Sequence, residues 1–198
     1  MELSPIFIDA IRVLHLFCFA AGMGIAVFFD WRAIRASHVE ISQDDLGVLS
    51  DIHAWIKMAF GGLWITGVVL IYIRTGFELG NFSPKLITKL AVMILMLLNV
   101  LAITRYVLPI FGENVGRTMF ELPYRKLATM SQCAINSIFF WFAGLTLGSS
   151  VVLKTQGWDV LLPMILGGFA VCTMGGQLIM LVMFAWHRVK TSLALKNA

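Results

Sequence analysis

The sequence predicts an all-α integral membrane protein, a bundle of five transmembrane helices. Of its 198 residues, 59% are hydrophobic and only 13% are charged, whereas soluble domains carry about 25% charged residues. The mean hydropathy is +0.86, and a soluble fold of this length cannot bury so much apolar surface. Apolar stretches that match a membrane span of about 20 residues recur along the chain. A lipid bilayer is therefore the expected environment.

Polar connections that contain Gly, Pro, Asn and charged residues separate the apolar stretches. The first stretch has no basic residues before it and no cleavage site after it, so we interpret it as a retained span and not as a signal peptide. No long linker or low-complexity segment is visible, and residues 1–198 are expected to form a single transmembrane domain. The predicted spans are residues 6–29, 52–74, 86–108, 127–153 and 160–186.

The distribution of Lys and Arg predicts the orientation of the bundle. Nine of these residues lie on one side of the predicted spans, five lie on the other, and Lys57 lies within a span. Because cytoplasmic loops are enriched in Lys and Arg, the side with nine is expected to face the cytoplasm. Five spans then place the N-terminus outside and the C-terminus in the cytoplasm. We expect a multi-pass protein of the bacterial inner (cytoplasmic) membrane, and we interpret the positive charge as an orientation signal, not as a nucleic-acid-binding surface.

Small residues at four-residue spacing predict close contacts between helices. The fourth span carries Gly144 and Gly148, and the fifth carries Gly168, Cys172 and Gly176. A compact bundle explains this spacing. The alternatives are a homo-oligomer or a larger membrane complex in which these faces contact a partner.

Ionisable side chains inside the spans are the candidate functional residues, because they are costly in lipid. His15 lies roughly 12 Å below the outer boundary of a hydrocarbon core about 30 Å thick, too deep for its side chain to reach water. We interpret it either as a ligand or proton-handling group, or as a neutral imidazole bonded to a polar neighbour. Lys89 lies near the outer end of the third span, where its side chain can extend outward or bend inward.

The four histidines of the chain raise the possibility of a haem b site. A haem takes axial ligands from the protein, and ligands on different helices must lie at one depth. His53 and His187 match in depth, at the cytoplasmic ends of their spans. His15 has no histidine partner at its level, but Met96 of the third span lies at about that depth. A His–Met site or a single-His site, with His15 as the iron ligand, is therefore also a candidate. The sequence has no CxxCH, HExxH or Walker motif and no acidic metal cage.

Two stretches carry a more specific pattern. The first span reads Arg12-Val13-Leu14-His15-Leu16, then Gly22-x-Gly24, and ends at Asp30-Trp31-Arg32. The third span opens with Pro84-Lys85-Leu86-Ile87-Thr88-Lys89-Leu90 and continues to Asn99. Over roughly the first 105 residues, this pattern resembles small uncharacterised bacterial membrane proteins related to the copper-resistance D-type proteins and to the membrane-bound, haem-binding protoporphyrinogen oxidases.

The resemblance implies a functional pair of residues. In the oxidase family, a histidine of the first span and a lysine of the third span act together. By position, the resemblance implies that His15 and Lys89 are the catalytic residues of a haem-dependent membrane oxidoreductase.

Three functions are consistent with the sequence. The first is a haem-b-binding redox protein that acts on a porphyrin or a quinone, in which His15 binds the iron and Lys89 pairs with a carboxylate. The second is a transporter for copper or another small solute, which predicts a polar path joining His15, Asn99, Asn136 and Gln177, although no inverted repeat is visible. The third is a non-catalytic accessory subunit of a larger membrane complex.

Overall fold

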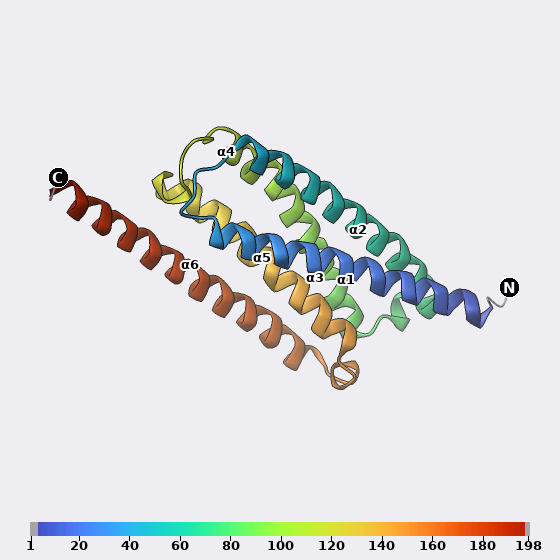
Figure 1. Cartoon of the computed structure of the whole chain (residues 1–198). Coiled ribbons are helices and arrows are strands. Elements are labelled where there is room, and N and C mark those ends of the chain that lie inside the picture. Colours follow the sequence, from blue (N-terminus) through green and yellow to red (C-terminus); the bar gives the residue numbers. More distant parts are fainter. Residues whose placement is uncertain (1–3, 197–198) are drawn as a thin grey trace.

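The computed structural model describes residues 4–196, which form helices joined by short loops, with no β-strand among them. Five helical segments are long and apolar enough to cross a membrane, so the predicted all-α class and the predicted number of spans are confirmed. Figure 1 shows rods that lie side by side, with the two termini at opposite ends of the bundle. We call these ends the N end and the C end.

Each helical segment extends beyond at least one of its predicted span boundaries. The third segment is divided into α3, a π-helical segment and α4. The bounds are α1 Pro5–Arg35, α2 Gln43–Thr75, α3 Pro84–Ala102, the π-helical segment Ile103–Val107, α4 Leu108–Gly112, α5 Tyr124–Ser149 and α6 Trp158–Lys196. Short 3-10 turns occupy Leu79–Asn81, Met119–Glu121 and Val152–Lys154 in the connections.

Capping groups set the ends of α2, and this explains why α2 is longer than its predicted span. The Ser42 hydroxyl accepts a hydrogen bond from the Asp45 N–H at 3.1 Å, and the Asp45 carboxylate accepts one from the Ser42 N–H at 3.1 Å. This reciprocal pair is a capping box, and it starts the helix at Gln43 instead of residue 52. At the other end, Gly76 adopts a left-handed φ of 61° that terminates the helix.

The π-helical segment in the third span was not predicted. Pro109 has no N–H, and in a regular α-helix its ring would collide with the carbonyl of Arg105. The wider turn at Ile103–Val107 comes directly before this proline and interrupts the regular hydrogen-bonding pattern. The helix then continues through Pro109 as α4 and ends at Gly112, beyond the predicted boundary at residue 108.

The packing of α1 against α2 depends on glycine. A Cβ atom added at Gly22 of α1 would lie 2.5 Å from Cη2 of Trp141, which is fully buried, and 3.4 Å from Cβ of Ala59 in α2. A Cβ atom added at Gly62 of α2 would lie 2.7 Å from Sγ of Cys18 in α1. Only hydrogen fits at Gly22, beside the ring of Trp141 in α5, and at Gly62, beside Cys18, so α1 packs closely against both α2 and α5.

The predicted small-residue contact of the fifth span forms within the chain. A Cβ atom at Gly168 of α6 would lie 3.3 Å from the Phe139 ring of α5, and one at Gly176 would lie 2.5 Å from Cδ1 of Ile135. In the fourth span, Gly148 has no described atom within 4 Å of such a position. The spacing of α6 is thus explained by its packing on α5, as expected for a compact bundle.

Amide side chains connect α3, α5 and α6. Asn136 donates a hydrogen bond to Oδ1 of Asn99 at 3.3 Å, and Gln132 donates one to Oδ1 of Asn136 at 2.7 Å. Gln177 donates to Oε1 of Gln132 at 2.9 Å, and Asn99 donates to the Cys133 carbonyl at 3.0 Å. These groups satisfy one another, as hydrogen-bonded contacts between membrane helices do.

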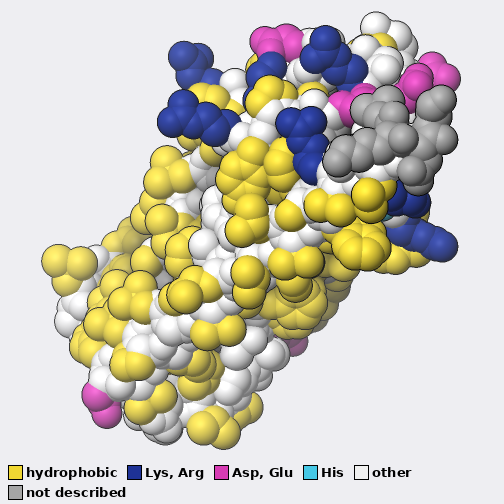
Figure 2. All heavy atoms as spheres, turned by 90° about the vertical axis from the view of Figure 1, so that its left-hand side faces the viewer, with side chains coloured by type: hydrophobic (Ala, Val, Ile, Leu, Met, Phe, Trp, Pro, Cys, Tyr) yellow, Lys and Arg dark blue, Asp and Glu magenta, His cyan; other side chains and the backbone are white. Residues whose placement is uncertain are grey.

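The outer surface is suited to a bilayer. In Figure 2, most of the visible charged side chains gather at one end, and hydrophobic side chains cover much of the flank. Large apolar side chains such as Ile65, Val171 and Met174 are 70–73% exposed. Such exposure would be unfavourable in water and is ordinary in lipid.

Gly22→Leu is expected to destabilise the bundle, because the larger side chain would have to displace the buried ring of Trp141. Overpacking of this kind costs about 1–3 kcal/mol, and thermal unfolding of the purified protein in detergent should occur at a lower temperature. Gly24→Leu is the matched control on the same helix, because no described atom lies within 4 Å of its Cβ position. Equal midpoints for the two variants would contradict the proposed packing.

Candidate functional site

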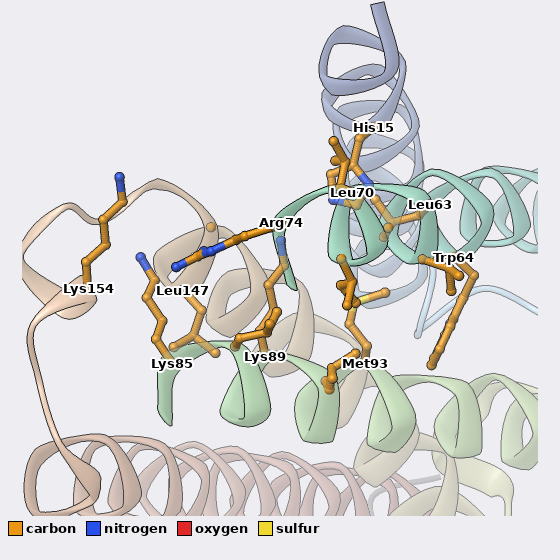
Figure 3. A pocket seen from close by; sticks show the side chains of 16 residues that line it. His15, Leu63, Trp64, Leu70, Arg74, Lys85, Lys89, Met93, Leu147 and Lys154 are labelled. Carbon is orange, nitrogen blue, oxygen red and sulfur yellow. The ribbon is translucent and has the colours of Figure 1, made fainter. Parts of the chain in front are cut away.

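A cavity at the N end brings together the two residues that the sequence singled out in the first and third spans. Its volume is about 230 Å³, and its walls come from α1, α2, α3, α5 and the turn after α5. His15 of α1 and Lys89 of α3 both line it (Figure 3). Side chains 74 residues apart in the sequence (89 − 15) therefore face the same space.

The hydrogen bonds of His15 determine which ring nitrogen carries the proton. Its Nδ1 lies 2.9 Å from Oγ1 of Thr66 in α2. The Thr66 hydroxyl has one hydrogen, which it donates to the Gly62 carbonyl at 2.7 Å. With its hydrogen on that carbonyl, the hydroxyl oxygen accepts from Nδ1–H, and this arrangement leaves a lone pair on Nε2 of His15. Metal-binding histidines are commonly held in this way, with one nitrogen fixed by a hydrogen bond and the other free for the metal.

A glycine makes room for the imidazole. A Cβ atom at Gly67 would lie 3.4 Å from Cε1 of His15, at the near edge of ordinary van der Waals contact. Thr66 and Gly67 are neighbours on α2, so one turn of this helix both binds the ring of His15 and leaves space for it.

Four cationic side chains line the cavity: Arg74, Lys85, Lys89 and Lys154. Figure 3 shows Lys85 and Lys89 extending from α3 to the same side, with Arg74 reaching toward them. The Lys85 ammonium donates a hydrogen bond to the Ser150 carbonyl, just beyond the C-terminal end of α5, where the helix dipole favours a cation.

No acidic side chain balances this charge inside the cavity. The residues that line it include no Asp or Glu, and the ion pairs found among residues 4–196 all involve other residues. Uncompensated positive charge in a partly apolar space favours an anion, because pairing offsets the cost of desolvation.

The rest of the wall is apolar and carries one unused donor. Leu63, Leu90, Met93 and Leu147 line the cavity beside Trp64. The indole Nε1 of Trp64 is buried and has no hydrogen-bond partner in the part of the chain that the structure describes. The cavity therefore suits a ligand that has an apolar body and an anionic edge.

The other predicted ligand residues lie elsewhere. Met93 and Met96 both belong to the hydrophobic core, but only Met93, one helical turn from Lys89, lines the cavity. His53 is buried in the half of the bundle nearer the C end, where its Nε2 lies 2.7 Å from Oγ1 of Thr104. His187 stacks against Phe120, with ring centroids 5.3 Å apart.

The structure therefore does not place the predicted pair His53 and His187 in one cavity. His53 lines a second cavity, and His187 lines neither of the two described here. Among the described residues, no group of three or more His, Cys, Asp or Glu side chains could hold a metal ion. A haem needs fewer ligands from the protein, because the porphyrin itself supplies four of the ligands to the iron.

The sequence did not identify Thr66, Arg74, Lys85 or Lys154 as site residues. The sequence counted these three cations as charges on the outer side. They flank two connections at the same end of the bundle: Arg74 and Lys85 lie on either side of the turn between α2 and α3, and Lys154 lies in the turn between α5 and α6. The signal for Lys85 was its position four residues before Lys89, on the same helix face. Thr66 is recognised as a site residue only once the structure shows how α1 is aligned against α2.

Comparisons with family models, with curated proteins and with solved structures found no match to this chain. The function must therefore be argued from the geometry of the site itself.

The hydrogen bonds predict opposite tautomers for two histidines. The Thr104 hydroxyl donates its hydrogen to the Val100 carbonyl at 3.0 Å, so it must accept from Nε2–H of His53. Nitrogen NMR of the protein labelled with ¹⁵N-histidine should show the Nδ1–H form for His15 and the Nε2–H form for His53. His15→Gln and His53→Gln variants assign the signals. Finding His15 in the Nε2–H form would contradict the free lone pair toward the cavity.

Proposed function

We propose that this chain is an integral membrane redox protein that binds haem b at the N end of the bundle. His15 binds the iron through Nε2, and Lys89 and its cationic neighbours pair with the propionates. The observation that carries the proposal is a single imidazole with a free Nε2 lone pair on a cavity that has four cations and no acidic side chain.

The donor set fits such a ligand. Haem b has an apolar ring, a metal that accepts imidazole nitrogen or thioether sulfur, and two carboxylates. The cavity has apolar walls, one available imidazole, the thioether of Met93 and the four cations. Its volume of about 230 Å³ is below the range of about 300–1,000 Å³ typical of enclosed ligand sites. The enclosed space therefore accommodates part of the ligand, and the remainder would contact lipid.

The protein residues have distinct tasks in this proposal. When bound, the haem supplies one-electron chemistry. Thr66 orients the imidazole of His15, Lys89 and Arg74 hold carboxylates, and the apolar walls exclude water. A porphyrin carries similar carboxylates and is one candidate substrate, with His15 and Lys89 as the catalytic pair; a quinone is the other candidate partner.

A transport function has less support. It requires a polar path through Asn99, Asn136 and Gln177, but these amides form hydrogen bonds within the contact between α3, α5 and α6. Polar groups that bind one another are not available to solvate a passing ion.

The orientation is part of the proposal. The excess of Lys and Arg at the C end supports a cytoplasmic location for that end. In a bacterial inner membrane, the cavity with His15 and Lys89 would then lie in the outer half of the bilayer, near the periplasm.

His15→Ala is expected to abolish the haem absorption band of protein purified from haem-replete cells, because it removes the axial ligand. Lys89→Met removes the charge and retains the length, so it should weaken haem binding about 10-fold, as expected for the loss of one charge-assisted contact. Lys89→Arg should retain most of the binding if charge alone matters.

His187→Ala is the matched control for these variants, because this histidine lies outside the cavity, and it should leave the spectrum unchanged. The proposal fails if His15→Ala retains the wild-type spectrum. It also fails if wild-type protein from haem-replete cells has no haem band and does not acquire one when haem is added.

Thiol labelling tests the orientation. In a chain whose native Cys18, Cys133 and Cys172 are replaced by serine, Gly80→Cys should react with an impermeant reagent added outside intact cells, because Gly80 lies in the exposed turn between α2 and α3 at the N end. Gln43→Cys, exposed at the C end, should react only after the cells are opened. The reverse pattern would invert the topology.

A further inference from the structure

A second cavity lies in the half of the bundle nearer the C end. It has a volume of about 380 Å³ and is formed by α1, α2, the π-helical segment, α5 and α6. It shares no lining residue with the first cavity. Most of its lining is apolar and includes the rings of Phe29, Phe111 and Phe120. The volume falls within the range typical of small-molecule sites.

One carboxyl group lines this apolar cavity without a partner. Oδ2 of Asp30 is buried and accepts no hydrogen bond from residues 4–196. The nearest basic residues on α1 are engaged elsewhere. Arg32 binds Asp45 at 3.3 Å, and the guanidinium of Arg35 lies 5.1 Å from the ring centroid of Trp31. A buried polar atom without a partner is unfavourable, so a ligand that donates a hydrogen bond to Asp30 would remove this cost.

A second acceptor belongs to His53, which also lines the cavity. With the Thr104 hydroxyl donating to Val100, its oxygen accepts a hydrogen bond from Nε2–H of His53, and Nδ1 then carries a lone pair. No hydrogen bond from another described residue reaches this Nδ1. The cavity therefore offers two acceptors on neighbouring helices, α1 and α2, within apolar and aromatic walls.

We propose that this cavity binds the reduced headgroup of a lipid-soluble quinol. A quinol has two hydroxyl donors on an aromatic ring and an apolar tail, and these match the two acceptors, the phenylalanine rings and the surrounding lipid. The oxidised quinone has two acceptors in place of two donors, so it donates no hydrogen bond to Oδ2 of Asp30 or to Nδ1 of His53. The site thus favours the reduced form. This inference uses residues of the second cavity only and does not rest on haem binding at the first.

The test is equilibrium binding to the full chain in lipid nanodiscs, with a decyl-substituted benzoquinol kept under anaerobic conditions. The quinol should bind the wild type at least about 10-fold more tightly than the corresponding quinone. A hydrogen bond to a charged or buried partner contributes a binding free energy that corresponds to about this factor in affinity. Asp30→Leu should lose at least about 10-fold in quinol affinity. Asp44→Asn is the control, because this aspartate is exposed at the same end of the bundle.

One further variant makes the result specific. Ala134→Phe places a ring inside the cavity and should block quinol binding even if Asp30→Leu folds poorly. Quinol binding is measured on haem-free protein, so failure of the haem proposal remains distinguishable from failure of this one.

Three results would overturn the inference. The first is equal affinity for quinol and quinone. The second is wild-type quinol affinity in folded Asp30→Leu or Ala134→Phe protein. The third is displacement of the quinol by decyltrimethylammonium at lower concentration than by unlabelled quinol, which would assign the site to cationic amphiphiles.

Discussion

The close approach of α1 to α2 is the constraint on which both cavities depend. Gly62 of α2 leaves room for Cys18 of α1, and Gly22 of α1 leaves room for Trp141 of α5. The antiparallel register of α1 and α2 then sets His15 against Thr66. The same register brings Asp30 and His53 to one cavity at the other end. In lipid, helices gain nothing from hiding apolar surface from one another, so such contacts rely on packing and hydrogen bonds.

The two cavities have complementary chemistry. The first presents cations and an available imidazole nitrogen near the N end, whereas the second presents two acceptors within apolar walls near the C end. In each, polar groups remain without protein partners among the described residues, at a cost to folding. Ligands that supply the missing partners give a physical reason for this cost, and a donor of reducing equivalents at one end would complement a haem at the other.

The sequence predicted the features that depend on composition and missed those that depend on rotation and register. Hydropathy identified five spans, because a span needs only enough apolar residues. The pairing of His15 with Lys89 came from a resemblance, and the structure places both in one cavity. Depth and the seven-residue spacing from Lys89 pointed to Met96, but Met93, four residues from Lys89, is the methionine that lines the cavity. The role of Thr66 depends on contacts between distant segments, and the π-helical segment depends on local strain at Pro109. Hydropathy carries no information about either feature, so the sequence analysis did not predict them.

The most direct measurement of the central claim is a spectroscopic titration of the haem-free protein with haem b and with its dimethyl ester. The two ligands share the iron and the ring, but the ester lacks the anionic carboxylates. The account predicts saturation at one haem per chain, with ester affinity about 10-fold or more lower at low salt, since charge-assisted contacts to the cations are lost. Equal affinities for haem and ester would contradict a site built on uncompensated positive charge.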